Sequence, residues 1–197
     1  MPFTFKQCRT AEGEIIAGLF EVFPKVFGDS RGYFFECYSR RDFEAAGICM
    51  NFVQDNQSSS GKGVLRGLHF QRNYPQGKLV RVIQGEVFDV ALDIRPGSGS
   101  RGRWHAVVLS GKEQNQFYIP PGFAHGFLVL SETCIFAYKC TDFYHPEDEG
   151  GIIWNDPAIG IKWPDLGMEY SLSEKDKKLP LFSSLVFSSL ATGEKQP

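Results

Sequence analysis

The sequence lacks a long apolar run and has no excess of charge of either sign. Its 197 residues carry 21 Lys and Arg against 23 Asp and Glu, a net charge of −2, which gives no reason to expect nucleic acid or an anionic membrane as a partner. The opening segment, MPFTFKQCRT, lacks the apolar core of a signal peptide, and no run approaches the ~20 residues of a membrane span. We therefore expect a cytoplasmic protein that binds any anionic ligand through a local cluster of cations.

Cysteines are few and helical patterns are scarce. The five cysteines are odd in number and irregularly spaced, which fits reduced thiols better than a disulfide framework. Residues 39–46, SRRDFEAA, predict a short helix with Ser39 as N-cap and Gly47 as stop signal. Residues 171–180, SLSEKDKKLP, predict a second one. The cysteines are Cys8, Cys37, Cys49, Cys134 and Cys140.

Short apolar runs separated by 21 glycines and 11 prolines fill most of the chain instead. That rhythm predicts an all-β fold, an antiparallel sandwich or barrel. Because no repeat, linker or boundary interrupts it, we expect one domain over residues 1–197, with a loose tail at about residues 183–197. The predicted strands are residues 33–38, 64–70, 78–84, 86–94, 104–109, 116–119, 126–129 and 134–140.

Residues 63–85, GVLRGLHFQRNYPQGKLVRVIQG, combine apolar strand residues with polar side chains. Arg66, His69, Gln71 and Lys78 are groups that an ordinary core has no reason to admit, because burying unpaired polar or charged groups is costly. Polar groups inside a predicted sheet indicate a site.

Strand alternation says where these groups point. It places Arg66 and His69 on opposite faces, so both line one cavity only if the strand twists or bulges, which Gly67 permits. In residues 86–94 one face is apolar and the other, which carries Asp89, is mixed. A mixed face fits either solvent or the wet interior of a barrel.

Seven motifs follow one another between residues 26 and 180: FGDSRGYFFE, FVQDNQSSS, VLRGLHFQ, QGKLVRVIQGEVFDVALDIR, IPPGFAHGF, YKCTDFY and GGIIWNDPAIGIKWP. Together they resemble the dTDP-4-dehydrorhamnose 3,5-epimerases. The resemblance implies a cupin-like jelly-roll barrel with a few short helices, a homodimer, and neither a metal nor an organic cofactor. It also implies that dTDP-4-dehydro-6-deoxy-D-glucose is epimerised at C3 and C5 to dTDP-4-dehydro-L-rhamnose, in dTDP-L-rhamnose biosynthesis.

The catalytic residues implied by the resemblance suit this chemistry. The carbonyl of a 4-keto sugar acidifies the C–H bonds at C3 and C5, so inversion needs a base on one face, an acid on the other and a partner for the enolate oxygen. His69 corresponds to the base and Asp176 to the carboxylate that orients it. Tyr138 corresponds to the general acid, and Lys78 to the cation beside the C4 oxygen.

The substrate contacts implied by the resemblance divide between the sugar and the nucleotide. Residues 27–36 are expected to cross to the neighbouring subunit's site, which makes dimerisation part of binding. The implied contacts are Asp89 and His125 for the sugar, Arg31 and Arg66 for the two phosphates, Phe27, Phe34 and Glu36 for thymine, and Gln54, Asn56 and Gln71 as further ligand contacts.

Each assignment has a structural alternative. His69 can be a hydrogen-bonded core histidine, Lys78 a solvated hairpin lysine, and Tyr138 a packing residue. Arg31 can be a turn arginine satisfied by Asp29.

Three other functions also have to be weighed. A metal-dependent cupin needs a His-x-His pair, but Gln71 stands at the paired position after His69. A non-catalytic nucleotide-sugar binding protein has no need for His69, Asp176 and Tyr138 together. An epimerase that inverts only C3 or only C5 stays open, because no spacing rule reveals the placement of Tyr138.

Phe143 replaces a tyrosine found in many relatives, which bears on sugar contacts.

Overall fold

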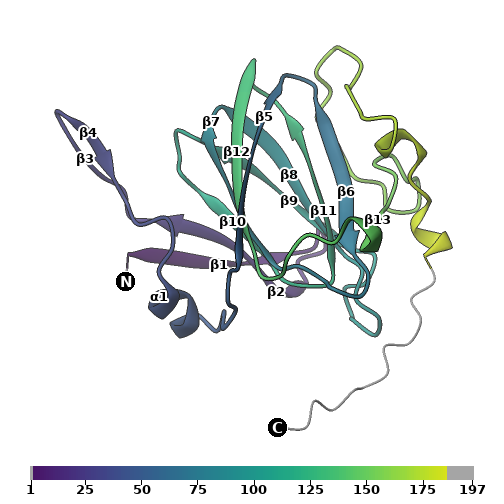
Figure 1. Ribbon diagram of the computed structural model, residues 1–197, viewed down its shortest axis with the longest axis horizontal. Coiled ribbons are helices and arrows are strands. Elements are labelled where there is room, and N and C mark those ends of the chain that lie inside the picture. Colours follow the sequence, from purple (N-terminus) through teal and green to yellow (C-terminus); the bar gives the residue numbers. More distant parts are fainter. Residues whose placement is uncertain (1, 186–197) are drawn as a thin grey trace, which may run out of the picture.

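Two antiparallel sheets packed face to face make up most of the fold, which the computed structural model describes for residues 2–185 (Figure 1). Both sheets bury apolar side chains between them, as expected of a jelly roll. The six-stranded sheet has the order β1 (Phe3–Arg9), β2 (Ile15–Pro24), β10 (Gln116–Ile119), β7 (Lys78–Gln84), β12 (Thr133–Cys140) and β5 (Gln54–Gly61). The five-stranded sheet has the order β13 (Glu149–Gly151), β6 (Leu65–Gln71), β11 (Phe123–Val129), β8 (Glu86–Asp93) and β9 (Trp104–Ser110).

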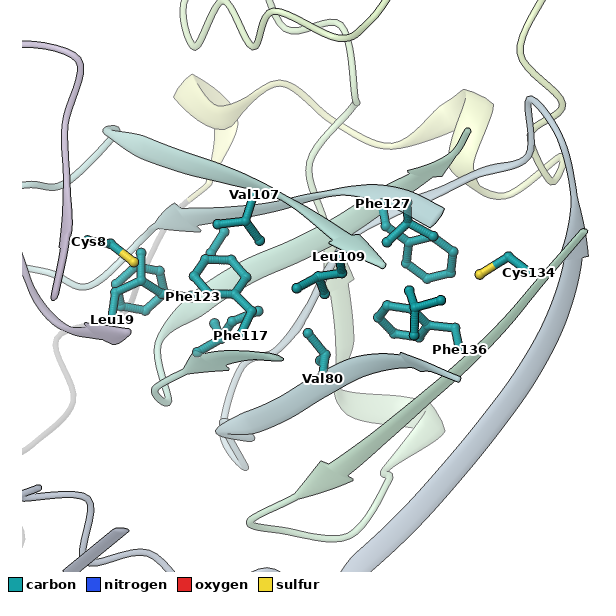
Figure 2. Close-up of a cluster of buried hydrophobic side chains, with 14 of the residues drawn as sticks. Cys8, Leu19, Val80, Val107, Leu109, Phe117, Phe123, Phe127, Cys134 and Phe136 are labelled. Atoms are coloured by element: carbon teal, nitrogen blue, oxygen red, sulfur yellow. The ribbon is translucent and has the colours of Figure 1, made fainter. Parts of the chain in front are cut away.

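The core between the two sheets is a continuous cluster of buried side chains (Figure 2). Phe117 and Phe136 enter it from the six-stranded sheet, and Leu109 and Phe127 from the five-stranded sheet. Phe127 and Phe136 stack across the gap with ring centroids 4.3 Å apart. At that end the polar groups described below replace the apolar filling.

The outer face of the five-stranded sheet is also covered. Val90 and Leu92 of β8 pack there against Ile159 and Trp163 of the C-terminal segment. Asp89 points to the opposite, inner face and is fully buried. The predicted alternation along β8 is confirmed, and the mixed face is the barrel interior rather than solvent.

A short helix covers the outer face of the six-stranded sheet. It is α1 (Arg40–Ala45), and Phe43 buries its ring against Leu79 and Tyr118. Gly47 adopts a φ of 84° just after the helix, as predicted for its stop signal. Ser39 precedes the helix but makes no side-chain capping bond.

The second predicted helix is only a single turn. The 3-10 turn η2 (Asp176–Lys178) occupies part of residues 171–180, and the Asp176 amide donates to Ser173 Oγ at 3.0 Å. Two other 3-10 turns are η1 (Pro146–Asp148) and η3 (Phe182–Ser184). Of the expected loose tail at 183–197, residues 186–197 lie outside the described part of the chain.

Seven of the eight predicted strands are confirmed in type and position, but the strand at 33–38 is wrong. Only Gly32–Phe34 is a strand there; as β4 it pairs with β3 (Phe27–Asp29) in an exposed hairpin that projects from the barrel (Figure 1). The structure adds five strands that were not among those predicted, namely β1, β2, β3, β5 and β13. No helix within residues 2–185 has the length and apolar character needed to cross a membrane.

Candidate active site

A cavity of about 610 Å³ opens between the two sheets. Arg66 and His69 of β6 and His125 of β11 line it from the five-stranded sheet. Lys78 of β7 and Tyr138 of β12 line it from the six-stranded sheet. The fold therefore brings the proposed base and the proposed acid to one cavity from opposite walls.

A β-bulge at Gly67 turns both Arg66 and His69 toward this cavity. His69 is opposite His125, whereas Arg66 is opposite Phe127, so β6 carries one more residue than β11 in this interval. Gly67 has a φ of 109°, and a Cβ there would lie 2.6 Å from the His125 carbonyl oxygen. The bulge predicted from strand alternation is confirmed, and the close backbone approach requires glycine at this position.

His69 is held by a buried carboxylate. Its Nε2 lies 2.6 Å from Asp176 Oδ1, and Asp176 is only 3% exposed. Burial opposes ionisation of Asp176, but the hydrogen bond and charge of His69 and the Gly67 amide outweigh it and lower the pKa of that carboxyl. Because an ionised carboxylate only accepts, Nε2 must carry the proton, which leaves the lone pair of the neutral ring on Nδ1.

A second histidine–carboxylate pair lies beside the first. His125 Nε2 is 2.9 and 3.0 Å from the two oxygens of Asp89, which lies behind it and is fully buried. Of these two residues only His125 reaches the cavity wall. Asp89 therefore fixes the orientation of the imidazole rather than meeting a ligand directly.

Lys78 and Tyr138 form the opposite wall. The Lys78 Nζ lies 5.9 Å from the centroid of the Tyr138 ring. Burial lowers the pKa of Lys78, partly offset by the charges of Cys140, Asp89 and Glu149. Burial raises the pKa of Tyr138 above its usual value, so the phenol keeps its proton at neutral pH.

The structure adds two charged residues that sequence reasoning missed. Glu149 Oε1 lies 3.9 Å from His69 Nδ1, and its Oε2 accepts hydrogen bonds from Tyr144 Oη, at 2.9 Å, and from Lys175 Nζ. Burial opposes ionisation of Glu149, but the hydrogen bonds of Lys175 and Tyr144 outweigh it and lower the pKa of Glu149. Lys175 reaches the cavity because the pairing of Ser171 with Val64 returns residues 171–176 to the barrel, an approach that no motif spacing indicates.

The predicted thymine contacts and Arg31 lie on the β3–β4 hairpin or just after it, outside the lining of this cavity. Phe27 and Phe34 are 51% and 67% exposed, and Glu36 follows them on the surface. Arg31 pairs with Asp29 at 2.6 Å, and its side chain is 88% exposed. Within a single chain Arg31 is thus a turn arginine satisfied by Asp29, which is the alternative to a phosphate ligand considered for it above.

The remaining predicted contacts lie beside the cavity or behind it. Asn56 of β5 is opposite Tyr138, accepts a hydrogen bond from Gln54 and donates one to Cys140 Sγ at 3.6 Å. Gln71 is buried outside the cavity wall, where its amide donates to the carbonyls at positions 74 and 143 and accepts from the backbone at position 145. These hydrogen bonds of Gln71 therefore stabilise the loops around it. Neither Gln54 nor Gln71 is part of the cavity lining.

Comparison with known proteins supplies names for relatives of this chain. A family model described as dTDP-4-dehydrorhamnose 3,5-epimerase matches residues 14–184. The dTDP-4-dehydrorhamnose 3,5-epimerase of Pseudomonas aeruginosa is 54% identical over 179 residues, which cover 90% of this chain and 96% of that protein.

Solved structures agree with this result. A dTDP-6-deoxy-D-glucose-3,5-epimerase from Legionella pneumophila, in complex with dTDP-4-keto-L-rhamnose, is 50% identical with a TM-score of 0.86, covering 93% of this chain and 95% of that one. A 3'-monoepimerase from Streptomyces bikiniensis, in complex with dTDP-quinovose, is 30% identical with a TM-score of 0.79 and covers 84% of each chain.

Proposed function

The chain belongs to the dTDP-4-dehydrorhamnose 3,5-epimerase family and is an isomerase; from that premise we propose that it inverts C3 and C5 of dTDP-4-dehydro-6-deoxy-D-glucose with His69 as base and Tyr138 as acid. The product is dTDP-4-dehydro-L-rhamnose, an intermediate of dTDP-L-rhamnose biosynthesis. The observation that carries the proposal is that His69 and Tyr138 line one cavity from opposite sheets. An inversion needs this arrangement, since the proton leaves one face of the sugar and returns to the other.

His69 begins each inversion. Its Nδ1 removes the proton from the carbon next to the ketone, and the electrons of the broken C–H bond move into the enolate, leaving negative charge on the C4 oxygen. The hydrogen bond of Nε2 to Asp176 supports this step, because the carboxylate stabilises the imidazolium that forms. The proton then passes from the imidazolium to solvent.

Lys78 stabilises the enolate. Burial lowers the pKa of Lys78, so its cation is poorly solvated and gains more from an anion placed beside it than a surface lysine would. The positive charge is in place before the reaction, and its stabilising effect is greatest when the oxygen becomes negative. Stabilisation of this kind commonly contributes roughly 10²–10³-fold in rate.

Tyr138 completes the inversion. Its phenol donates a proton to the face of the carbanion opposite His69, and the resulting phenolate recovers a proton from solvent. The raised pKa of Tyr138 keeps the phenol protonated and ready to donate. Repeating the cycle at the second carbon gives the double epimerisation.

The nucleotide is held by residues of two subunits in this proposal. Arg66 lies at the cavity wall with its guanidinium on Ser60 Oγ at 2.9 Å, placed to receive a phosphate. Phe27, Arg31 and the rest of the β3–β4 hairpin reach the site of a second copy in a homodimer. Support comes from the exposure of the hairpin aromatics on an element that projects from its own barrel.

A cytoplasmic location accords with five cysteines that are all free thiols.

The second candidate is epimerisation at C3 alone, because the chain also resembles a 3'-monoepimerase in fold and sequence. Incubation with dTDP-4-dehydro-6-deoxyglucose in deuterated water, followed by NMR of the sugar, separates the two. The proposal predicts deuterium at both C3 and C5 and an L-rhamno product. Deuterium at C3 only, without inversion at C5, would make this chain a monoepimerase.

A further inference from the structure

A second cluster of reactive side chains lies at the end of the barrel away from the catalytic cavity. It joins Cys8 of β1, Glu21 of β2 and His105 of β9, whose potential ligand atoms all lie within 4.8 Å of one another. Cys8 is at one end of the core cluster and Phe127 and Phe136, which line the cavity, are at the other (Figure 2). Within residues 2–185 no other group of three such side chains is close enough to share a metal ion.

The hydrogen bonding of His105 leaves a buried lone pair. Its Nδ1 lies 2.8 Å from the carbonyl oxygen of Arg9, so Nδ1 must carry the hydrogen. In the neutral ring Nε2 is then an acceptor, and this atom is buried with no hydrogen-bond partner. It faces Glu21 Oε1 at 3.7 Å, which is also an acceptor. With His105 neutral, two acceptors therefore face each other with no hydrogen between them, an arrangement that a bound cation would stabilise.

We propose that Cys8, Glu21 and His105 bind a divalent cation of the zinc class, with a water molecule as fourth ligand. Thiolate, imidazole and carboxylate are the ligands that Zn²⁺ takes in tetrahedral sites. Its bonds to nitrogen and oxygen place two such ligand atoms about 3.3–3.6 Å apart in a tetrahedron, so Nε2 and Oε1, at 3.7 Å, have to approach each other only slightly. A histidine that donates its other nitrogen to a backbone carbonyl is the usual arrangement in metal sites, because it fixes the ring.

Two groups compete with the metal and set conditions on binding. Lys6 Nζ lies 2.8 Å from Glu21 Oε1, but its side chain is 66% exposed and can turn into solvent. Burial, followed by the charge of Glu21, raises the pKa of the Cys8 thiol to about 12, so the metal must displace the thiol proton to solvent as the metal–sulfur bond forms. The side chains of Glu21 and His105 are 14% and 22% exposed, which leaves a route for the ion and its water.

The position of the site gives it a structural role. β1 and β2 form one end of the six-stranded sheet, and β9 is an edge of the five-stranded sheet. A metal bound by all three residues cross-links the two sheets far from His69 and Tyr138. It should therefore raise the thermal unfolding temperature without taking part in epimerisation.

Cobalt titration of the protein, made without a histidine tag, tests the proposal. We expect a single equivalent of Co²⁺ with a thiolate-to-metal charge-transfer band, displaced by one equivalent of Zn²⁺. The band should be lost in Cys8→Ser and in His105→Val and retained in Cys49→Ser, which removes an exposed cysteine. Lys6→Gln should bind Co²⁺ several-fold more tightly, because it removes the competing cation.

Epimerase activity of each variant, measured without added metal, shows that it is folded. A wild-type protein that binds no stoichiometric metal would overturn the proposal. The same charge-transfer band in active Cys8→Ser would place the metal elsewhere and also overturn it. Should Cys8→Ser and His105→Val both be inactive, Lys6→Gln decides: tighter binding supports the site, and unchanged affinity contradicts it.

Discussion

His69 Nε2 and Asp176 Oδ1 lie 2.6 Å apart although 107 residues separate them in the sequence. The contact depends on η2, which returns to β6 from the C-terminal segment. Asp176 also accepts a hydrogen bond from the Gly67 amide at 3.5 Å. It fixes the tautomer of His69 and leaves Nδ1 as the basic atom. The base is therefore assembled from the barrel and from a segment that closes over it.

Replacing His69 by Asn should abolish deuterium exchange at both C3 and C5, because a single base is proposed to serve both carbons. The measurement is NMR of the substrate after incubation in deuterated water. His145→Asn is the matched control, since His145 lies outside the cavity lining, and should exchange at the wild-type rate. Exchange that persists at one carbon in His69→Asn would reveal a second base.

Asp176 should contribute stability that acid removes. Its pKa is lowered in the folded protein, so this contribution is complete above the unfolded-chain value of about 4 and is lost as the pH falls through the folded value. Urea unfolding at steps of pH below 5 should show wild type losing stability faster than Asp176→Asn. Asp165→Asn, which removes an exposed carboxylate, should follow wild type. Parallel curves for wild type and Asp176→Asn would contradict the assignment.

Replacing Lys78 by Met should reduce exchange and inversion together, by roughly 10²–10³-fold in kcat, because both require the enolate. Lys139→Met is the matched control: Lys139 is on the same sheet and next to Tyr138, but its side chain pairs with exposed Asp55 at 2.9 Å. Initial rates from both variants, with KM measured separately, check this. If Lys78→Met raises KM and leaves kcat unchanged, Lys78 only binds the substrate.

Exhaustive chelation should leave the epimerase rate unchanged while lowering the thermal unfolding temperature of protein that had been loaded with Zn²⁺. The catalytic steps are assigned to His69, Lys78 and Tyr138, whereas the proposed metal site lies at the far end of the core. Activity and unfolding temperature are measured on the same samples before and after dialysis. Loss of activity that Zn²⁺ restores would mean that the metal acts in catalysis.

The sequence predicted those parts of the fold whose burial follows from a pattern of apolar residues. β8 and β11 are covered on both faces, so their apolar runs were visible, and the alternation around Asp89 predicted its inward position. β5, with the sequence QDNQSSSG, has no apolar pattern and is a strand because β12 pairs with it. The β3–β4 hairpin is exposed on both sides, so no apolar pattern marked its two short strands, although the turn between them was indicated by Asp29 and Arg31.

The residues of the candidate site also divide into those that the sequence predicted and those that only the fold brings together. His69, Lys78 and Tyr138 belong to motifs on regular strands, and the bulge that turns Arg66 inward was predicted from Gly67. Glu149 was missed because it reaches His69 through the pairing of β13 with β6, and Lys175 was missed because its place in the cavity lining depends on how residues 171–176 return to the barrel. The cluster of Cys8, Glu21 and His105 joins three separate strands, and only the assembled fold brings it together.

Exchange and inversion measured together in Tyr138→Phe decide whether Tyr138 is the acid that completes the epimerisation. The phenyl ring keeps the volume of the side chain and removes only the hydroxyl, so the substrate should still bind and His69 should still remove the proton. We expect that deuterium continues to enter the sugar while product of inverted configuration falls sharply. Equal residual rates for exchange and inversion in Tyr138→Phe would contradict the assignment of Tyr138 as the acid on the opposite face.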